Sequence, residues 1–270
     1  MRELLIRTLS GAVLVAVIIT CILVSPWTCA ALGLLIVIVG TYEMSKLQHV
    51  ESLPHYLAVL LFTLVAYGIA VLIALKILSQ RWLWLELLVP MLPFLLSLFS
   101  KTVDFKKMAS FSYVSLAYLC LPTAMMVFMY QQELFGDMAG ARLILLIFAL
   151  LWTNDTFAYL TGRLLGKHKL FVRVSPGKTI EGSLGGLLFT IGGVILFSHY
   201  VDWLPMRTAV GLGLIAVFFG TLGDLCESML KRQAGVKDSG RLIPGHGGIL
   251  DRFDSVLFAI PFVFVYLLLL

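Results

Sequence analysis

The 270-residue chain is 60% hydrophobic and only 13% charged, and its mean hydropathy is +0.99. Soluble globular chains carry about 25% charged residues, so the composition excludes a soluble domain, and this much hydrophobicity excludes a disordered chain. Because the apolar residues come in long runs, we expect an all-α, polytopic integral membrane protein with about nine transmembrane helices.

Nine apolar windows are long enough to cross a bilayer as helices, the form that satisfies backbone hydrogen bonds in lipid. They are 8–24, 27–45, 57–78, 83–99, 110–130, 141–162, 180–200, 207–231 and 250–270. The first window follows basic residues as a signal peptide would, but no small-residue cleavage site precedes Pro26, so we expect a retained helix. The fourth window contains Pro90 and Pro93, and we expect it to kink or to re-enter the membrane.

The basic residues predict the orientation in the membrane. With the N-terminus in the cytoplasm, 16 of the 20 Lys and Arg residues fall on the cytoplasmic side, as the positive-inside rule requires. The two largest basic segments, 163–178 and 231–252, both lie in the C-terminal half. We therefore expect membrane helices of unassigned role over 1–140, a catalytic region over 141–270, and an active site that faces the cytoplasm from the cell (inner) membrane.

The eighth window carries a polar stripe. Asp224, Glu227, Ser228 and Lys231 are offset by 0, 3, 4 and 7 residues, which places them on one helical face. An ionisable residue inside a spanning helix costs about 2.5–3.5 kcal/mol on insertion scales and commonly marks function. The stripe predicts a polar, water-accessible site near the cytoplasmic end; the alternative is an internal ion-pair stripe that holds helices together.

A second stripe, Asp155, Tyr159 and Arg163, runs along the sixth window toward the same side. For Asp155, a structural ion pair is the alternative to a functional role. The segment 175–186 then combines turn formers, Lys178 and a helix start, which together could cradle a phosphate, although the Walker A spacing is missing. Glycines in a membrane helix also permit close packing, and the sequence alone does not decide between the two.

The densest polar chemistry lies between residues 228 and 254. Glycines there allow the backbone to bend and approach a ligand, and Asp251 and Asp254 open the ninth helix three residues apart. Helix capping alone would explain the two carboxylates but not the basic residues around them. Those basic residues are Lys231, Arg232, Lys237, Arg241 and Arg252, with His246 among them.

Carboxylates beside cations in a glycine-rich loop suit a nucleoside triphosphate. Mg²⁺ is held by a few carboxylate oxygens and by the phosphates themselves, while basic side chains neutralise the leaving pyrophosphate. Asp224 and Asp251 are the metal pair that we predict, from two adjacent helices. His246 is a candidate base, a phosphate donor or a hydrogen bonder that fixes the loop. Phosphoryl-type displacement depends mainly on positioning and charge neutralisation.

The run from Ser228 to Asp254 closely resembles the signature of the phosphatidate cytidylyltransferases, also called CDP-diacylglycerol synthases. It reads S-x-L-K-R-x4-K-D-x-G-x2-I-P-G-H-G-G-I-x-D-R-F-D, without a departure from that pattern over its 27 positions. The upstream stretch from Asn154 to Lys167, and the residues 175–182, are also similar to this family. The resemblance covers about the C-terminal 40% of the chain.

This resemblance implies a dimeric, helical membrane enzyme of phospholipid biosynthesis that joins CTP and phosphatidate to give CDP-diacylglycerol and pyrophosphate, without a nucleic-acid partner. It implies dependence on Mg²⁺, with a second, monovalent cation such as K⁺ nearby. Carried onto this sequence, Asp224, Asp251 and Asp254 would hold the metal, and Lys231 and His246 would join Asp224 and Asp251 as catalytic residues. The residues that would bind the substrates are Asp155, Arg163, Lys178, Ser228, Arg232, Lys237, Arg241, Gly247, Gly248 and Arg252.

Three other functions compete with this one. A CDP-alcohol phosphotransferase would carry a DGxxAR-type aspartate run, which is absent from the sequence. A polyprenol kinase that uses CTP would transfer a bare phosphate to an alcohol instead of a cytidylyl group to a lipid phosphate. A transporter or channel would also bury charges in its helices, but it would distribute them across the bilayer.

Overall fold

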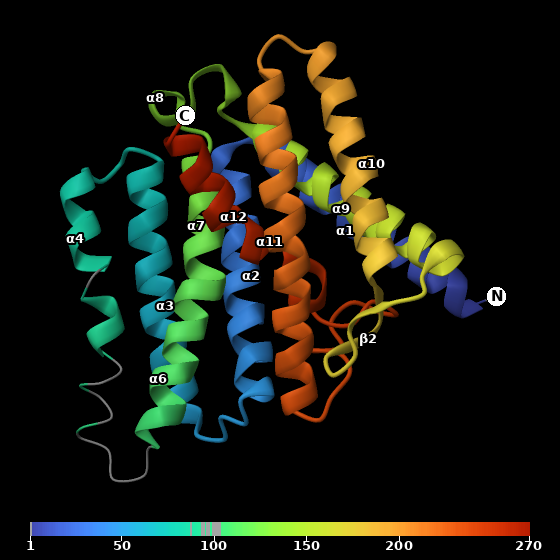
Figure 1. The fold of residues 1–270 in the computed structure, drawn as a ribbon. Coiled ribbons are helices and arrows are strands. Elements are labelled where there is room, and N and C mark those ends of the chain that lie inside the picture. The colour runs from blue at the N-terminus through green and yellow to red at the C-terminus, as the bar shows by residue number, and fades with distance from the viewer. Residues whose placement is uncertain (1, 87, 93–94, 96–97, 99–103) are drawn as a thin grey trace. The chain divides into compact units, whose positions relative to one another are not determined.

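The computed structural model (Figure 1) describes residues 2–86, 88–92, 95, 98 and 104–270. The chain divides into two compact units. Unit 1 comprises Met1–Tyr130 and Gln233–Arg252, and unit 2 comprises Gln131–Arg232 and Phe253–Leu270. Each unit is described separately below.

Unit 1 is a helical bundle with one long loop. Its long helices are α1 (Arg2–Val24), α2 (Pro26–Leu47) and α3 (Leu53–Ala74), followed by α6 (Phe105–Val114), the π-helical turn η3 (Ser115–Cys120) and α7 (Leu121–Phe128). Shorter pieces are η1 (Gln80–Trp82), α4 (Leu83–Glu86) and η2 (Val89–Met91). Ser25 caps α2 through a capping box with Thr28.

Side-chain to main-chain hydrogen bonds tie the helices of unit 1 together. The Tyr67 hydroxyl on α3 donates to the carbonyl oxygen of Ala30 on α2 at 2.8 Å, and Gly33 leaves room for this tyrosine ring. The Tyr130 hydroxyl donates to the Ile22 carbonyl oxygen on α1. Pro122 has no N–H to donate, which accounts for the π-turn η3 directly before α7.

Unit 2 is built on two helical pairs. Short α8 (Gln132–Phe135) and η4 (Gly136–Met138) lead into α9 (Ala141–Leu165), which is joined to α10 (Ile180–His199) by an antiparallel two-stranded sheet, β1 (Lys169–Phe171) and β2 (Ser175–Thr179). Lys169 pairs with Thr179, and Phe171 pairs with Ser175. The second pair is α11 (Met206–Gln233) and α12 (Leu250–Leu268), of which α12 begins in unit 1.

Small residues allow close helix contacts in unit 2. Gly182 and Gly186 of α10 lie against the backbone of α9, and a Cβ at Gly186 would stand 2.6 Å from Asn154 Oδ1. On α11, Gly223 faces the main chain of α12, where a Cβ would stand 2.7 Å from the Asp254 carbonyl oxygen. The glycines that follow Lys178 therefore serve close packing, as one of the two interpretations of this segment predicted.

Within the described residues, seven helices are long and apolar enough to cross a membrane. They are Ile6–Val24, Pro26–Leu47, Leu53–Ala74, Phe105–Phe128, Ala141–Leu165, Ile180–His199 and Met206–Gln233. These correspond to seven of the nine predicted windows, so the expectation of an all-α, polytopic membrane protein is confirmed.

The other two predicted spans, and so the count of nine, stay predictions. The fourth window, 83–99, falls partly outside the described residues, and its described part includes the four-residue α4 and the three-residue η2. The ninth window is the 19-residue helix α12, which carries Asp251, Arg252 and Asp254 near its start. The predicted boundary between residues 140 and 141 concerns function and also stays a prediction.

Candidate active site

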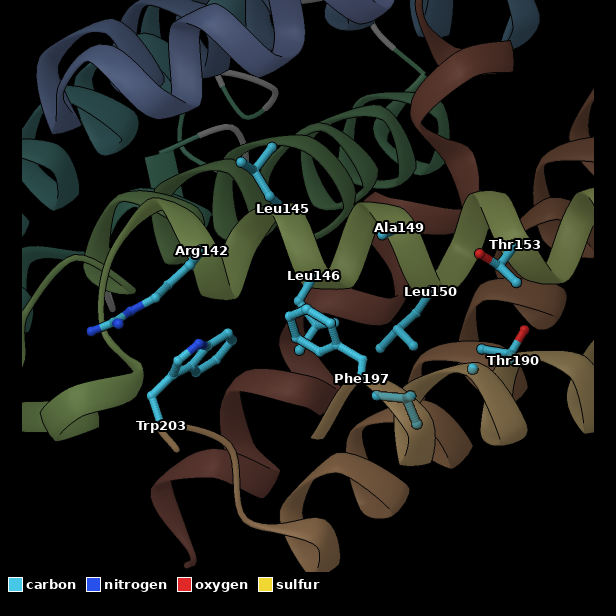
Figure 2. Close-up of a pocket in the computed structure, with 11 residues that line it drawn as sticks. Arg142, Leu145, Leu146, Ala149, Leu150, Thr153, Thr190, Phe197 and Trp203 are labelled. Carbon is cyan, nitrogen blue, oxygen red and sulfur yellow. The ribbon is translucent and has the colours of Figure 1, made fainter. Parts of the chain in front are cut away.

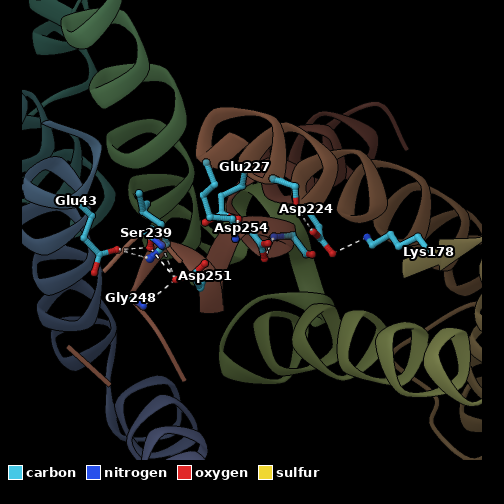
Figure 3. Close-up of polar contacts among 12 residues, drawn as sticks. Glu43, Lys178, Asp224, Glu227, Ser239, Gly248, Asp251 and Asp254 are labelled. Atoms are coloured by element: carbon cyan, nitrogen blue, oxygen red, sulfur yellow. Dashed lines mark hydrogen bonds and ion pairs between the residues drawn. The ribbon is translucent and has the colours of Figure 1, made fainter. Parts of the chain in front are cut away.

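The predicted site residues fall into two groups, one in each unit (Figure 3). The group in unit 1 is the loop from Lys237 to Gly248 together with the start of α12. The group in unit 2 is the polar face of α11 with its neighbours. Asp224 and Asp251 belong to different units, so the predicted contact between them stays a prediction.

The loop of unit 1 is organised by a carboxylate that the sequence analysis missed, Glu43 of α2. Its side chain is 3% exposed, and it accepts hydrogen bonds from the backbone N–H groups of Ile249 and Leu250, each at 2.9 Å. The Ser239 hydroxyl donates to it as well, at 2.9 Å. Because the first N–H groups of a helix have no partner within the helix, Glu43 caps α12 and supplies the negative charge that a helix N-terminus favours.

Two glycines make room for the Glu43 carboxylate. A Cβ on Gly240 or Gly248 would collide with the carboxylate of Glu43, and one on Gly248 would also collide with the Ser239 hydroxyl. The glycine spacing of this loop therefore has a structural cause. The signal that could have revealed Glu43 was present in the sequence, since it is an ionisable residue inside the predicted window 27–45.

Asp251 holds the same loop from the first turn of α12. Its Oδ2 atom accepts from the Ser239 N–H at 2.9 Å, the Ser239 hydroxyl at 2.9 Å and the Gly248 N–H at 2.8 Å. Gly247 has a φ of 84° and lies so close that a Cβ would stand 2.6 Å from this oxygen. Asp251 Oδ2 and Glu43 share the single Ser239 hydroxyl proton, and the two backbone N–H groups tie Asp251 to the loop.

His246 is held by α1 in unit 1. The Ser10 hydroxyl lies 2.9 Å from His246 Nδ1 and 2.8 Å from the Pro244 carbonyl oxygen. The His246 N–H donates to the Ile243 carbonyl oxygen at 2.9 Å, which closes a turn with Pro244 second and Gly245, at a φ of 75°, third. This is the residue order of a type II turn. Of the three roles predicted for His246, these contacts favour the one that fixes the loop.

The predicted cations of this loop remain accessible. Lys237, Arg241 and Arg252 are exposed. They surround a loop whose backbone is fixed by the buried Glu43 and the partly buried Asp251. Such an arrangement offers cationic side chains to a ligand from a rigid base.

In unit 2, Asp224 joins α11 to the β-hairpin. Asp224 Oδ2 forms an ion pair with Lys178 Nζ at 2.5 Å, and its Oδ1 accepts from the Ser228 hydroxyl at 3.2 Å. Both side chains of the ion pair are about 30% exposed or less, so a solute can still reach them. The structure thus brings together three predicted site residues, and Figure 3 shows Lys178 reaching from the hairpin toward α11.

The polar stripe on α11 divides into two pairs, each four residues apart. Glu227 is fully buried and forms an ion pair with Lys231, whose side chain is 11% exposed. A buried ion pair of this kind fits the structural interpretation of the stripe. Asp224 and Ser228 remain partly exposed and fit the functional one. Burial thus favours the structural interpretation for Glu227 and Lys231, and the functional role of Asp224 and Ser228 stays a prediction.

Two more predicted carboxylates, those of Asp254 and Asp155, lie near the polar face of α11 in unit 2. Asp254 on α12 is close enough to interact electrostatically with Asp224, Lys231 and Asp155. Asp254 also accepts from the Ser255 N–H at 2.6 Å. On α9, Asp155 and Arg163 are exposed on one face of the helix, as the predicted stripe requires.

Glu181, which the sequence analysis did not single out, fixes the connection between α9 and the hairpin. It accepts from the Lys167 N–H at 3.0 Å and lies 2.6 Å from His168 Nδ1. The neighbouring Thr179 caps α10 by accepting from the Gly182 N–H at 3.1 Å. Because Thr179 already caps one of the backbone N–H groups at the start of α10, Lys178 is a stronger candidate for a phosphate contact than these N–H groups are.

The donor set is compatible with Mg²⁺. No group of three or more His, Cys, Asp or Glu side chains suited to a metal occurs in the part of the chain that the structure describes. Mg²⁺ does not require such a group, since it is usually bound by one or two carboxylates together with substrate phosphates and water. Asp224 and Asp254, on neighbouring helices of unit 2, can supply two.

Comparison with known proteins places the chain in a family. The sequence profile of the Cytidylyltransferase family matches residues 5–270. The chain belongs to the cytidylyltransferase family. The match extends over both units and therefore includes the N-terminal helices, to which the motif resemblance did not reach.

Curated relatives of this cytidylyltransferase carry a more specific name. The chain is 46% identical over 165 residues to a phosphatidate cytidylyltransferase of Staphylococcus epidermidis, and 44% identical over 161 residues to one of Staphylococcus aureus. A protein of the same name in Staphylococcus saprophyticus is also 44% identical. Each alignment covers 59% of this chain and 59% of the relative, so the chain spans about three fifths of the length of the relatives it matches.

Proposed function

We propose that this cytidylyltransferase is a phosphatidate cytidylyltransferase, which condenses CTP with phosphatidate to give CDP-diacylglycerol and pyrophosphate. The observation that carries the proposal is the family match over residues 5–270, which includes the Lys178–Asp224 pair and the Glu43-anchored loop. The names of the relatives support phosphatidate as the lipid substrate.

In the proposed reaction, a phosphate oxygen of phosphatidate attacks the α-phosphorus of CTP in line with the bond to the β-phosphate. A new P–O bond forms at the α-phosphorus, and the bond to the bridging oxygen breaks. Pyrophosphate leaves with the electron pair of that bond. The attacking oxygen is already anionic, so no strong base is needed, and positioning with charge neutralisation supplies the catalysis.

The cations of unit 2 bind phosphate in this proposal. Lys178 is partly exposed and already positioned by Asp224, so it can turn its ammonium group to a triphosphate oxygen. Arg163 and Arg232 are exposed and add further positive charge, and Asp155 accompanies Arg163 on α9. Lys231 contributes positive charge to this region from a position fixed by buried Glu227, so its role in the proposal is electrostatic and does not require contact with the phosphates.

The loop of unit 1 contributes the remaining groups. Lys237, Arg241 and Arg252 bind the leaving pyrophosphate or the lipid phosphate in this proposal. Gly247 and Gly248 contribute to substrate binding by letting Asp251 and Glu43 hold the loop in place. Ser228 and His246 hold neighbouring groups in place. Asp251 supports the loop through Oδ2 and is proposed to contribute to holding the metal.

In this proposal Asp224, Asp254 and Asp251 would hold Mg²⁺, which would supply charge neutralisation at the phosphates, and a monovalent cation such as K⁺ would also be required. The enzyme is further proposed to act as a homodimer in the cell membrane with this site on the cytoplasmic side. The bacterial relatives and the excess of basic residues on one side of the predicted spans support this location and orientation.

Labelled CTP tests the proposed reaction. The purified full-length chain in lipid nanodiscs is incubated with phosphatidate, Mg²⁺ and CTP that carries the label on either the α- or the γ-phosphate. We expect the α-label in a lipid product and the γ-label in pyrophosphate. Transfer of the γ-label to a lipid alcohol would indicate a kinase and contradict the proposal, as would the absence of any labelled lipid.

A further inference from the structure

An apolar groove lies between α9 and α10 in unit 2, away from the residues assigned to catalysis (Figure 2). Its volume is about 500 Å³, within the range of about 300–1,000 Å³ that is typical of ligand sites. Leu146, Leu150 and Val194 form its buried floor, and Phe197 lies at its rim. The groove is therefore large enough for a ligand and predominantly apolar.

Charge and aromatic side chains are confined to one end of the groove. Arg142, in the first turn of α9, is exposed and its guanidinium carbon lies 5.2 Å from the centre of the Trp203 ring. A guanidinium held over a ring face by a cation–π interaction still has N–H groups that can donate to an anion. Tryptophan is also the residue typical of the membrane–water interface. Figure 2 shows Arg142 and Trp203 together at this end.

The opposite end of the groove is marked by two hydroxyl groups. Thr153 and Thr190 lie there (Figure 2), and among the described residues the buried Thr190 hydroxyl has no hydrogen-bond partner. From Arg142 to Thr153 the helix rises about 16 Å, at about 1.5 Å per residue. This is about half of the roughly 30 Å hydrocarbon core of a bilayer. The groove thus has the depth of one leaflet.

We propose that this groove binds an anionic phospholipid, with one acyl chain along α9 and α10 and the phosphate on Arg142. The apolar floor matches the chain, the length matches a single leaflet, and the only cation that lines the described groove stands where a headgroup lies. Arg142 is at the end of α9 opposite Arg163, so the bound lipid occupies the leaflet opposite the one proposed for the reaction. The site does not depend on the proposed activity.

Two glycines of α10 provide a matched pair of variants. A Cβ at Gly193, which lines the groove, would meet nothing within 4 Å, so Gly193→Leu introduces an apolar side chain at the groove from a position where its Cβ has room. A Cβ at the neighbouring Gly192 also meets nothing within 4 Å, but Gly192 does not line the groove. Arg142→Gln removes the cation, and Arg207→Gln, at an exposed arginine of the same unit, is its control.

The test is photo-labelling of the full-length chain in phosphatidylcholine nanodiscs. Two probes carry the same photoreactive acyl chain, one on phosphatidylglycerol and one on phosphatidylcholine, and labelled peptides from α9 and α10 are quantified. We expect the anionic probe to label these peptides about tenfold more than the zwitterionic one, as one charge-assisted hydrogen bond predicts. Arg142→Gln should abolish that difference, and Gly193→Leu should lower labelling by both probes.

The controls Arg207→Gln and Gly192→Leu should label as the wild-type chain does. Equal labelling by the two probes in the wild-type chain would overturn the proposal, and so would wild-type labelling of both Arg142→Gln and Gly193→Leu. Cross-linking of the groove to a second copy of the chain in place of lipid would overturn it too. Size-exclusion profiles of the variants establish that each is folded, and the cytidylyl transfer assay reports independently on the proposed function.

Discussion

The replacement Glu43→Gln tests whether this buried carboxylate holds the loop of unit 1. Glu43 accepts from the N–H groups of Ile249 and Leu250 through different oxygens, and from Ser239. Glutamine keeps one acceptor oxygen and turns an NH₂ group toward the other donor. One hydrogen bond to a charged group is lost, at about 1.5–3 kcal/mol, together with about 0.5–2 kcal/mol of interaction with the helix N-terminus.

A loss of about 3 kcal/mol corresponds to a roughly hundredfold larger open population of the loop. Hydrogen exchange of the full-length chain in nanodiscs measures it, through peptides that cover residues 239–250. We expect about hundredfold faster exchange there in Glu43→Gln and unchanged exchange in Glu51→Gln, which alters an exposed glutamate of the same unit. A change below about threefold in Glu43→Gln would refute the assigned role of Glu43.

Three further predictions concern other parts of the site and fold. Asp224→Asn should lower the rate of cytidylyl transfer about a hundredfold or more with an unchanged melting temperature. The control Asp202→Asn, at an exposed loop residue, should leave the rate unchanged. Near-normal activity of Asp224→Asn would exclude the metal role. His246→Gln, which can still pair with Ser10, should retain most of the activity, and a loss as large as that of Asp224→Asn would instead indicate direct catalysis. Gly186→Val should lower the melting temperature by several degrees, because the valine side chain collides with Asn154. The control Gly192→Val should leave the melting temperature unchanged. Equal melting temperatures of the two variants would contradict the tight α9–α10 contact.

The helices were predictable from the sequence because a bilayer leaves little choice of secondary structure. Window 27–45 became α2, Pro26–Leu47, and window 141–162 became α9, Ala141–Leu165. The face of α11 was also predictable, since helical periodicity fixes which residues neighbour each other, and the Asp224–Ser228 contact four residues apart follows directly.

Contacts between distant segments were not predictable. Glu43 binds residues more than 200 positions away, and no periodicity connects α2 with the start of α12. For the same reason the sequence marked Lys178 and Asp224 as two separate polar sites, and it did not predict the ion pair between them. The glycines at 240 and 248 had been interpreted as room for a ligand, whereas each makes room for the Glu43 carboxylate.

The central claim is that acidic side chains of two helices share one divalent ion beside the nucleotide. The most direct measurement is anomalous diffraction from crystals of the full-length chain with Mn²⁺ in place of Mg²⁺ and a non-hydrolysable CTP analogue. The account predicts an anomalous peak within coordination distance of a carboxylate oxygen of Asp224 and of one of Asp251 or Asp254. A peak that does not contact Asp224, or that contacts neither Asp251 nor Asp254, would contradict it, as would a nucleotide bound away from Lys178.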